Sequence, residues 1–344
     1  MLNLLLTYDY ELFFNDSFAS EKEVLIDTTY EIINALSQEE ISATFFVDTP
    51  SVIAYQKYMQ TYYPDMVREQ IRVMLDNGFD VQLHIHPIWF KALYDGNRWS
   101  FDNDYYSLKS FDDISSIVRE SKESLDNLVA KHPAYRCCAF RAGGFCFSPQ
   151  KELIASLMDE GIVIDSSVCK NVKMDTTVQQ FDYTDMPRKY NWFFNEDIAI
   201  ETKQNRSLFE IPVGTCGAIP KKYFLTHAYP KLVYPPVKGK PTPVINNRKL
   251  TVFGKIINSL STPVLFTLDS LHSGALEAFV NYFSKKAIDR DIYVAVIGHP
   301  KFSSSSCVEN TISFVRKVKN KTGVRFITMR DVAASILDER NQKQ

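Results

Sequence analysis

The chain alternates short apolar segments with amphipathic ones along most of its length, and this alternation constrains the fold more than any other feature. Runs such as NLLLT (3–7), SATFFV (42–47) and IYVAVIG (292–298) have the length and composition of buried strands. The segments between them carry helix signals, for example a capping box at Ser20 and Glu23. Repeated strand–helix units predict a parallel sheet, and seven or eight of them favour a barrel, with irregularities, over an open sheet.

Composition excludes several classes of protein. The chain has 344 residues, of which 45% are hydrophobic, so it can bury a large core and is not globally disordered. The net charge of −2 gives no general attraction to nucleic acid. No apolar run is long enough for a transmembrane helix, and the first residues, MLNLLLTYDYELFF, are typical of a strand and not of a signal peptide.

The six cysteines form no C-x-x-C pair and no disulfide framework. Several of them lie in apolar, strand-like segments. We expect free and mostly buried thiols in a reducing compartment, which indicates a cytoplasmic protein.

Two histidines lie in the apolar segment VQLHIHPIWF (81–90). On a strand, His84 and His86 point to the same face, and Pro87 ends regular pairing directly after them. Two imidazoles on one face can bind a divalent metal, but a third ligand must come from elsewhere in the chain. The alternative is a pair of hydrogen-bonded histidines near a surface.

Polar residues also lie at the carboxyl ends of other predicted strands, either as the last residue of the strand or directly after it. In a βα barrel the carboxyl ends of all strands open on one face, and that face holds the active site. In isolation each of these residues has a simpler interpretation, such as a solvated loop acid, a surface ion pair or a helix cap. Together they predict one site, formed by Asp9, Glu11, His84, His86, Arg141, Asp165, Ser166 and His299.

These residues lie in five short motifs whose order and spacing resemble those of the polysaccharide deacetylase family, also called carbohydrate esterase family four. The resemblance implies a distorted (β/α)7 barrel, here with an irregular basic insertion, and a single catalytic domain over residues 1–344. The motifs are TYDYEL (7–12), LHIHP (83–87), FRAGGF (140–145), DSS (165–167) and IGHP (297–300).

The motifs depart from the best-known members of that family. The first reads D-x-E instead of two adjacent aspartates, and the second has histidines two apart instead of four. Gly143 stands where the third motif usually has a proline. The chain therefore looks like a divergent branch, of a kind often encoded near genes for surface polysaccharides.

The resemblance and the residue types together suggest a metal centre. Two imidazoles and one carboxylate leave positions open on a divalent metal, of which zinc is our first choice, for water and an acyl oxygen. We assign Glu11, His84 and His86 as the ligands. The assignment of the metal carboxylate to Glu11 and not to Asp9 is open at this stage.

The remaining motif residues suit acid–base chemistry. We expect Asp9 to be the general base, with Arg141 keeping it ionised. We expect His299 to be the general acid, with a neighbouring carboxylate such as Asp165 raising its pKa. The backbone N–H of Gly144 is a candidate for stabilising the oxyanion.

Residues 211–268 contain eight Lys or Arg residues and no Asp or Glu. One interpretation is a rim, with Lys238 and Lys240 as substrate-binding residues, for an anionic partner such as a nucleotide-sugar, a lipid phosphate or an acidic glycan. The alternative is a solvated loop whose charges balance acids elsewhere.

The sequence thus predicts a metal-dependent enzyme that removes an N-acetyl group from a carbohydrate in surface polysaccharide or lipopolysaccharide biosynthesis. An O-acetyl esterase or a deformylase acting on a sugar would use the same water attack. A non-catalytic sugar-binding barrel is a third hypothesis. The presence of both Asp9 and His299, the proposed acid–base pair, argues against the third.

Overall fold

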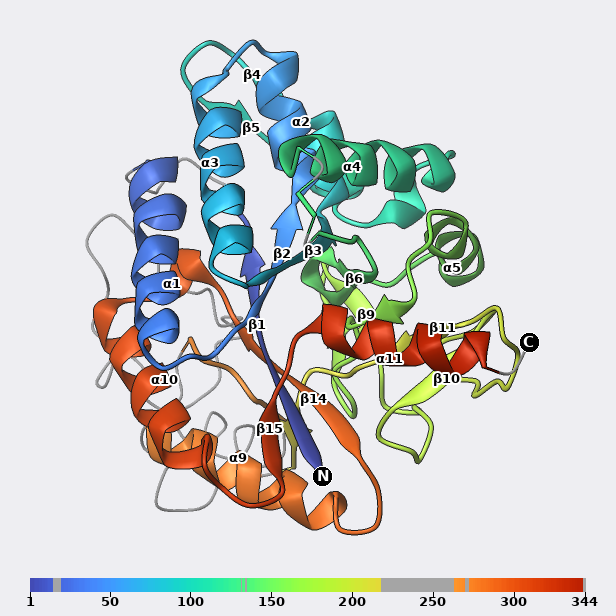
Figure 1. Ribbon diagram of the computed structural model, residues 1–344. Helices are drawn as coiled ribbons and strands as arrows, with labels where there is room; N and C mark the ends of the chain where they lie inside the picture. Colours follow the sequence, from blue (N-terminus) through green and yellow to red (C-terminus); the bar gives the residue numbers. More distant parts are fainter. Residues whose placement is uncertain (15–19, 131, 134, 218–262, 270–271, 343–344) are drawn as a thin grey trace, which may run out of the picture.

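Seven parallel strands form the centre of the molecule (Figure 1). The computed structural model describes residues 1–14, 20–130, 132–133, 135–217, 263–269 and 272–342. Along the sheet the order of the parallel strands is β11, β7, β6, β3, β2, β1 and β14. Their bounds, in chain order, are β1 (Leu2–Tyr10), β2 (Thr44–Asp48), β3 (Asp80–Ile85), β6 (Ala139–Ala142), β7 (Ile164–Asp165), β11 (Leu208–Glu210) and β14 (Ile292–Gly298).

The sheet curls until its two ends meet. The segment after β11 forms a parallel bridge from Val213 to Ala295 in β14, and Thr267 forms another to Ile297. Backbone hydrogen bonds from Gly214 N to Ala295 O and from Ala295 N to Pro212 O support the closure. The predicted distorted (β/α)7 barrel is therefore confirmed.

Short strands extend and decorate the barrel. β10 (Trp192–Phe194) adds an antiparallel edge to β11, and β15 (Val324–Phe326) pairs with the beginning of β1. Three small antiparallel pairs lie outside the main sheet. They are β4 (Leu93–Tyr94) with β5 (Trp99–Ser100), β8 (Lys173–Asp175) with β9 (Gln180–Asp182), and β12 (Thr215–Cys216) with β13 (Val264–Leu265).

Helices surround the strands (Figure 1). The α-helices are α1 (Thr28–Gln38), α2 (Thr49–Lys57), α3 (Tyr62–Asp76), α4 (Ile114–Leu128), α5 (Gln150–Asp159), α9 (Ser273–Lys286), α10 (Ser305–Val318) and α11 (Met329–Asn341). Helix α1 packs beside α10, and α4 packs beside α5. None of the helices in the described ranges is long and apolar enough to cross a membrane.

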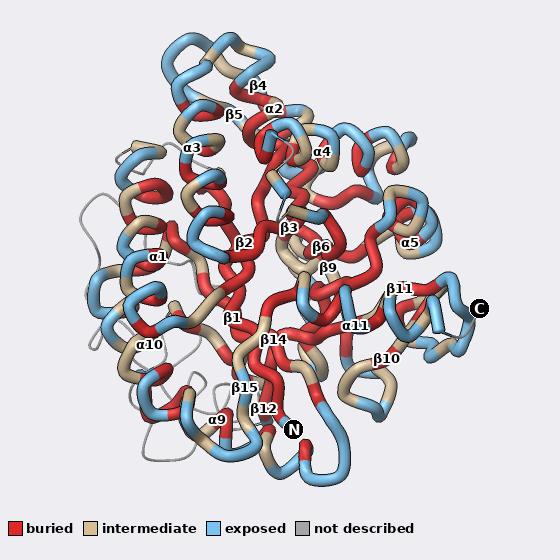
Figure 2. The backbone as a smooth tube through the Cα atoms, viewed as in Figure 1, coloured by how far each residue is buried: buried red, intermediate tan, exposed pale blue. Residues whose placement is uncertain are grey.

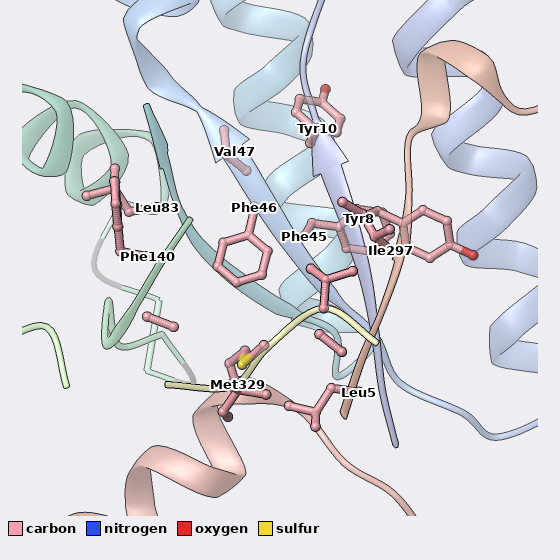
Figure 3. Close-up of a cluster of buried hydrophobic side chains, with 14 of the residues drawn as sticks. Leu5, Tyr8, Tyr10, Phe45, Phe46, Val47, Leu83, Phe140, Ile297 and Met329 are labelled. Carbon is pink, nitrogen blue, oxygen red and sulfur yellow. The ribbon is translucent and has the colours of Figure 1, made fainter. Parts of the chain in front are cut away.

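The core lies along the parallel strands, which Figure 2 shows as almost continuously buried. Aromatic and aliphatic side chains fill it; Figure 3 shows Tyr8 and Phe45, whose rings stack with centroids 5.3 Å apart. Met329, at the start of α11, is fully buried, and its N–H donates to Thr44 Oγ1 at the beginning of β2. The amino-terminal end of the barrel is therefore covered, and the polar site lies at the opposite end.

Candidate metal and acid–base site

Glu11, His84 and His86 form one buried cluster at the carboxyl ends of β1 and β3. One ligand atom from each residue lies within 4.8 Å of the other two. Glu11 Oε2 is 3.4 Å from His84 Nε2 and also contacts His86 Nε2. The expectation that the two imidazoles point to the same side is confirmed, and Glu11, not Asp9, is the carboxylate that joins them.

The donor set fits a divalent metal. Glu11 Oε2 and His84 Nε2 are buried, and among the described residues neither atom has a hydrogen-bond partner outside this cluster. Nδ1 of His84 lies 2.8 Å from the carbonyl oxygen of Arg141. Because a carbonyl only accepts, Nδ1 carries the proton, and the lone pair of Nε2 is directed at the cluster. Two imidazoles and one carboxylate are a common ligand set for catalytic zinc.

Asp9 lies beside this cluster and forms an ion pair with Arg141. Arg141 Nη1 is 2.5 Å from Asp9 Oδ1, and both side chains are buried. β1 and β6 are separated in the sheet by β2 and β3, so the guanidinium crosses the barrel interior. Burial by itself would raise the pKa of Asp9, but Arg141 and then two nearby imidazoles lower it below its usual value. The predicted pairing is confirmed.

Four further contacts fix the Arg141 guanidinium. Its Nε donates to Ser166 O at 2.9 Å, and Nη2 donates to Thr7 Oγ1 and to Ser166 Oγ at 3.0 Å each. Its Cζ lies 4.3 Å from the ring centroid of Phe46. Arg141 is therefore held rigidly and orients Asp9.

His299 follows β14 and has a carboxylate partner of its own, Asp269. His299 Nδ1 is 2.7 Å from Asp269 Oδ2, and the backbone N–H of His299 donates to Asp269 Oδ1 at 2.7 Å. Burial would lower the pKa of His299, but Asp269 and then Asp9 raise it above its usual value. His299 Nε2 lies 3.6 Å from Asp9 Oδ2. A neighbouring carboxylate was expected, but its assignment to Asp165 was wrong.

Asp165 serves a different part of the structure. Its oxygens accept from Ser167 N at 3.1 Å and from Ser167 Oγ at 2.7 Å, and Ser167 Oγ accepts in turn from Ala142 N. Asp165 is also aligned with Glu210 across β7 and β11. Burial and then the Asp165 carboxylate raise the pKa of Glu210 well above its usual value. These contacts anchor the chain that follows Arg141.

Glycines stand beside His86 for a steric reason. A Cβ atom on Gly143 would lie 2.5 Å from His86 Nδ1 and 2.6 Å from the Ile85 carbonyl oxygen. Gly144 has φ +57°, and a Cβ there would meet the Tyr106 hydroxyl at 2.5 Å. The replacement of the usual proline by Gly143 therefore makes room for His86. Gly144 lies in the same turn as Gly143. Its role in stabilising the oxyanion stays a prediction.

No protein-family profile matches the chain, and no curated protein matches it. Among solved structures, a putative polysaccharide deacetylase from Mycobacterium smegmatis has a TM-score of 0.51 at 12% identity, with 98% of this chain and 91% of that chain covered. A PuuE allantoinase has a TM-score of 0.51 at 12% identity, with 97% and 89% covered. The chain has the polysaccharide deacetylase fold.

Several residues of this deacetylase fold's site were missed by the sequence analysis. Asp48 is the last residue of β2; its Oδ1 accepts from His86 N at 2.9 Å, and burial raises its pKa to about 7. Asp269 follows the predicted strand 263–268, and Lys301 lies two residues after His299. Asp48 and Asp269 could have been found, because both directly follow segments that were predicted to be strands.

The predicted substrate-binding residues Lys238 and Lys240 lie outside the residues that the structure describes. The same holds for most of the basic segment 211–268. The hypothesis of a basic rim around the deacetylase-fold site therefore stays a prediction from sequence.

Proposed function

We propose that this protein is a metal-dependent hydrolase that removes an N-acetyl group from a carbohydrate. The observation that carries the proposal is the buried Glu11–His84–His86 cluster, which has a candidate base and a candidate acid beside it. The polysaccharide deacetylase fold supports the choice of reaction. Removal of an acetyl group from nitrogen needs an activated water, a polarised carbonyl and a proton for the leaving amine.

Glu11, His84 and His86 would hold the metal, and zinc is the ion that this ligand set fits best. A bound divalent ion would polarise the acyl carbonyl and make its water more acidic. The protonated Nδ1 of His84 fixes the orientation of one ligand ring. The Asp48 carboxylate accepts a hydrogen bond from the backbone N–H of His86 and so helps to position the second ligand.

The candidate base and acid occupy defined positions. Arg141 occupies Asp9 Oδ1, which leaves Oδ2 to accept a proton from water. Asp269 holds Nδ1 of His299, so that Nε2 is the atom that donates a proton to the leaving amine. The N–H of Gly144 would donate to the developing oxyanion.

The substrate class and location belong to the same proposal. The acid-free segment around Lys238 and Lys240 suits a sugar that carries phosphate or another acid, as in surface polysaccharide or lipopolysaccharide biosynthesis. All six cysteines are buried as thiols and none forms a disulfide, which supports a reducing compartment such as the cytoplasm.

An acetate-release assay tests the proposal. The protein is loaded with zinc and incubated with N-acetylated sugars, free and nucleotide-linked, and with matched O-acetyl and N-formyl sugars and allantoin. Acetate release from an N-acetyl sugar is the expected result. Release only from the O-acetyl or N-formyl series, or turnover of allantoin alone, would contradict the choice of bond.

A matched pair of variants shows whether acetate release comes from this site or from a contaminating enzyme. Asp9→Asn should abolish release, whereas Asp182→Asn, which removes an exposed carboxylate paired with Lys173, should leave it unchanged. Binding of the sugars without turnover under any metal condition would favour the non-catalytic barrel.

A further inference from the structure

Lys301 is a buried lysine that the mechanism above does not use. It lies in a short 3-10 helix, Pro300–Phe302, and its side chain is 7% exposed. Its Nζ donates to Glu11 Oε1 at 2.9 Å and to the Leu12 carbonyl oxygen at 3.0 Å. A buried ammonium loses its hydration and persists only where its partners replace the lost water.

Aromatic rings complete the surroundings of this ammonium. Lys301 Nζ lies 5.2 Å from the ring centroid of Phe13 and 5.4 Å from those of Phe14 and Phe302. These distances are in the range of cation–π contacts. The rings and the two oxygens therefore fix the position of the positive charge.

The two oxygens of Glu11 are divided between different partners. Oε1 is the oxygen that Lys301 holds, whereas Oε2 is the oxygen that lies against His84 Nε2 and His86 Nε2. A carboxylate that chelates a metal through both oxygens needs both of them free. With Oε1 held by an ammonium, Glu11 presents a single oxygen to the cluster.

Each acid of the D-x-E motif thus has its own buried cation. Arg141 pairs with Asp9, and Lys301 pairs with Glu11. The two ion pairs give the two carboxylates different roles. Asp9 is left to accept a proton, and Glu11 is oriented as a metal ligand.

We propose that Lys301 is a positioning residue that makes Glu11 a one-oxygen ligand of the metal centre and so keeps the coordination number low. The proposal rests on the metal site of the proposed function. It predicts that loss of Lys301 weakens metal binding and lets Oε1 join the coordination sphere.

Cobalt binding tests this inference, because Co²⁺ replaces zinc and its visible absorption reports the coordination number. Lys301→Met should weaken Co²⁺ binding by about 10–100-fold, the usual effect of losing a group that orients a ligand. The visible absorption of Co²⁺ bound to the saturated Lys301→Met variant should also be weaker than in the wild type, because absorption falls when the coordination number of Co²⁺ increases. Lys301→Arg keeps the positive charge, so its Co²⁺ affinity and its Co²⁺ absorption should stay close to those of the wild type. Lys319→Met is the matched control, since Lys319 pairs with Glu39 at the same 2.9 Å.

A double-mutant cycle separates an effect that passes through Glu11 from a general loss of structure, and Lys301→Arg keeps the test possible if Lys301→Met folds poorly. In a Glu11→Gln background, Lys301→Met should have no further effect on Co²⁺ affinity, because Lys301 acts through Glu11. An effect of equal size in both backgrounds would overturn the inference. Equal or tighter binding with an unchanged spectrum in Lys301→Met would overturn it as well. A wild type that binds no Co²⁺ would instead overturn the metal site itself.

Discussion

His299 Nδ1 lies 2.7 Å from Asp269 Oδ2, and Asp269 Oδ1 accepts a hydrogen bond from the backbone N–H of the same histidine. One carboxylate therefore fixes both the ring and the backbone of His299. The contact also fixes the tautomer, since Nδ1 donates to Asp269 and Nε2 is directed toward Asp9.

Asp269→Asn should lower kcat by about 100-fold or more, because general acid catalysis by a well-oriented histidine is worth about 10²–10⁴. Metal content should stay near that of the wild type. Steady-state kinetics together with metal analysis checks this. Asp165→Asn is the comparison variant. It should lower the unfolding temperature and change kcat much less than Asp269→Asn does. If the kinetic effects of the two variants are exchanged, Asp165 is the partner of the acid after all.

Asp9→Asn should abolish measurable turnover and leave the metal in place, because Asp9 contacts Arg141 and not the ligand cluster. Turnover and bound metal are measured on the same preparation. Loss of the metal from Asp9→Asn would mean that Asp9, not Glu11, is the ligand carboxylate.

Gly143→Ala should weaken zinc binding by about 10–100-fold, because the added Cβ would lie 2.5 Å from His86 Nδ1 and displace the ring. Competition with a chelator measures the affinity. Gly161→Ala is a control for backbone strain, since Gly161 has φ +77° and no atom within 4 Å of its Cβ position. Equal losses of affinity in both variants would refute the steric explanation.

Much of this arrangement could be predicted from the sequence. Strand–helix alternation indicated the barrel. The rule that functional residues lie at the carboxyl ends of parallel strands located Glu11, His84, Arg141 and His299 at one site. The partners of these residues were harder to predict, because pairing across a barrel depends on how tightly the sheet curls. Asp269 was missed and Asp165 was chosen in its place, although Asp269 directly follows one predicted strand just as Asp165 ends another.

Lys301 shows a different limit. A lysine next to Pro300 and Phe302 in a loop is usually exposed, and nothing in its local sequence indicates burial. Its role depends on contacts with residues 11–14, almost the whole chain away, which only the closed barrel brings together.

Glu210→Gln should stabilise the protein at high pH. Burial and the neighbouring Asp165 raise the pKa of Glu210 well above its usual 4.5, so the folded protein keeps a proton that the unfolded chain releases. Stability from this group is complete below pH 4.5 and is lost as pH rises toward the folded pKa.

Glutamine cannot ionise and can still donate to Asp165. The difference in unfolding free energy between Glu210→Gln and the wild type should therefore grow with pH, by at most about 1.4 kcal/mol per pH unit for one proton. Thermal and urea unfolding from about pH 5 to pH 8 measure it. Glu152→Gln, which changes an exposed glutamate, should show no such trend. A difference that is constant or falls with pH would contradict the raised pKa of Glu210.

Metal analysis after dialysis against zinc tests whether Glu11, His84 and His86 bind one catalytic divalent ion. We expect one zinc per wild-type chain, the same for Asp9→Asn, and almost none for a folded variant that combines His84→Ala with His86→Ala. A wild type that binds no zinc, or a folded double variant that keeps one ion per chain, would show that these three residues do not form the metal site.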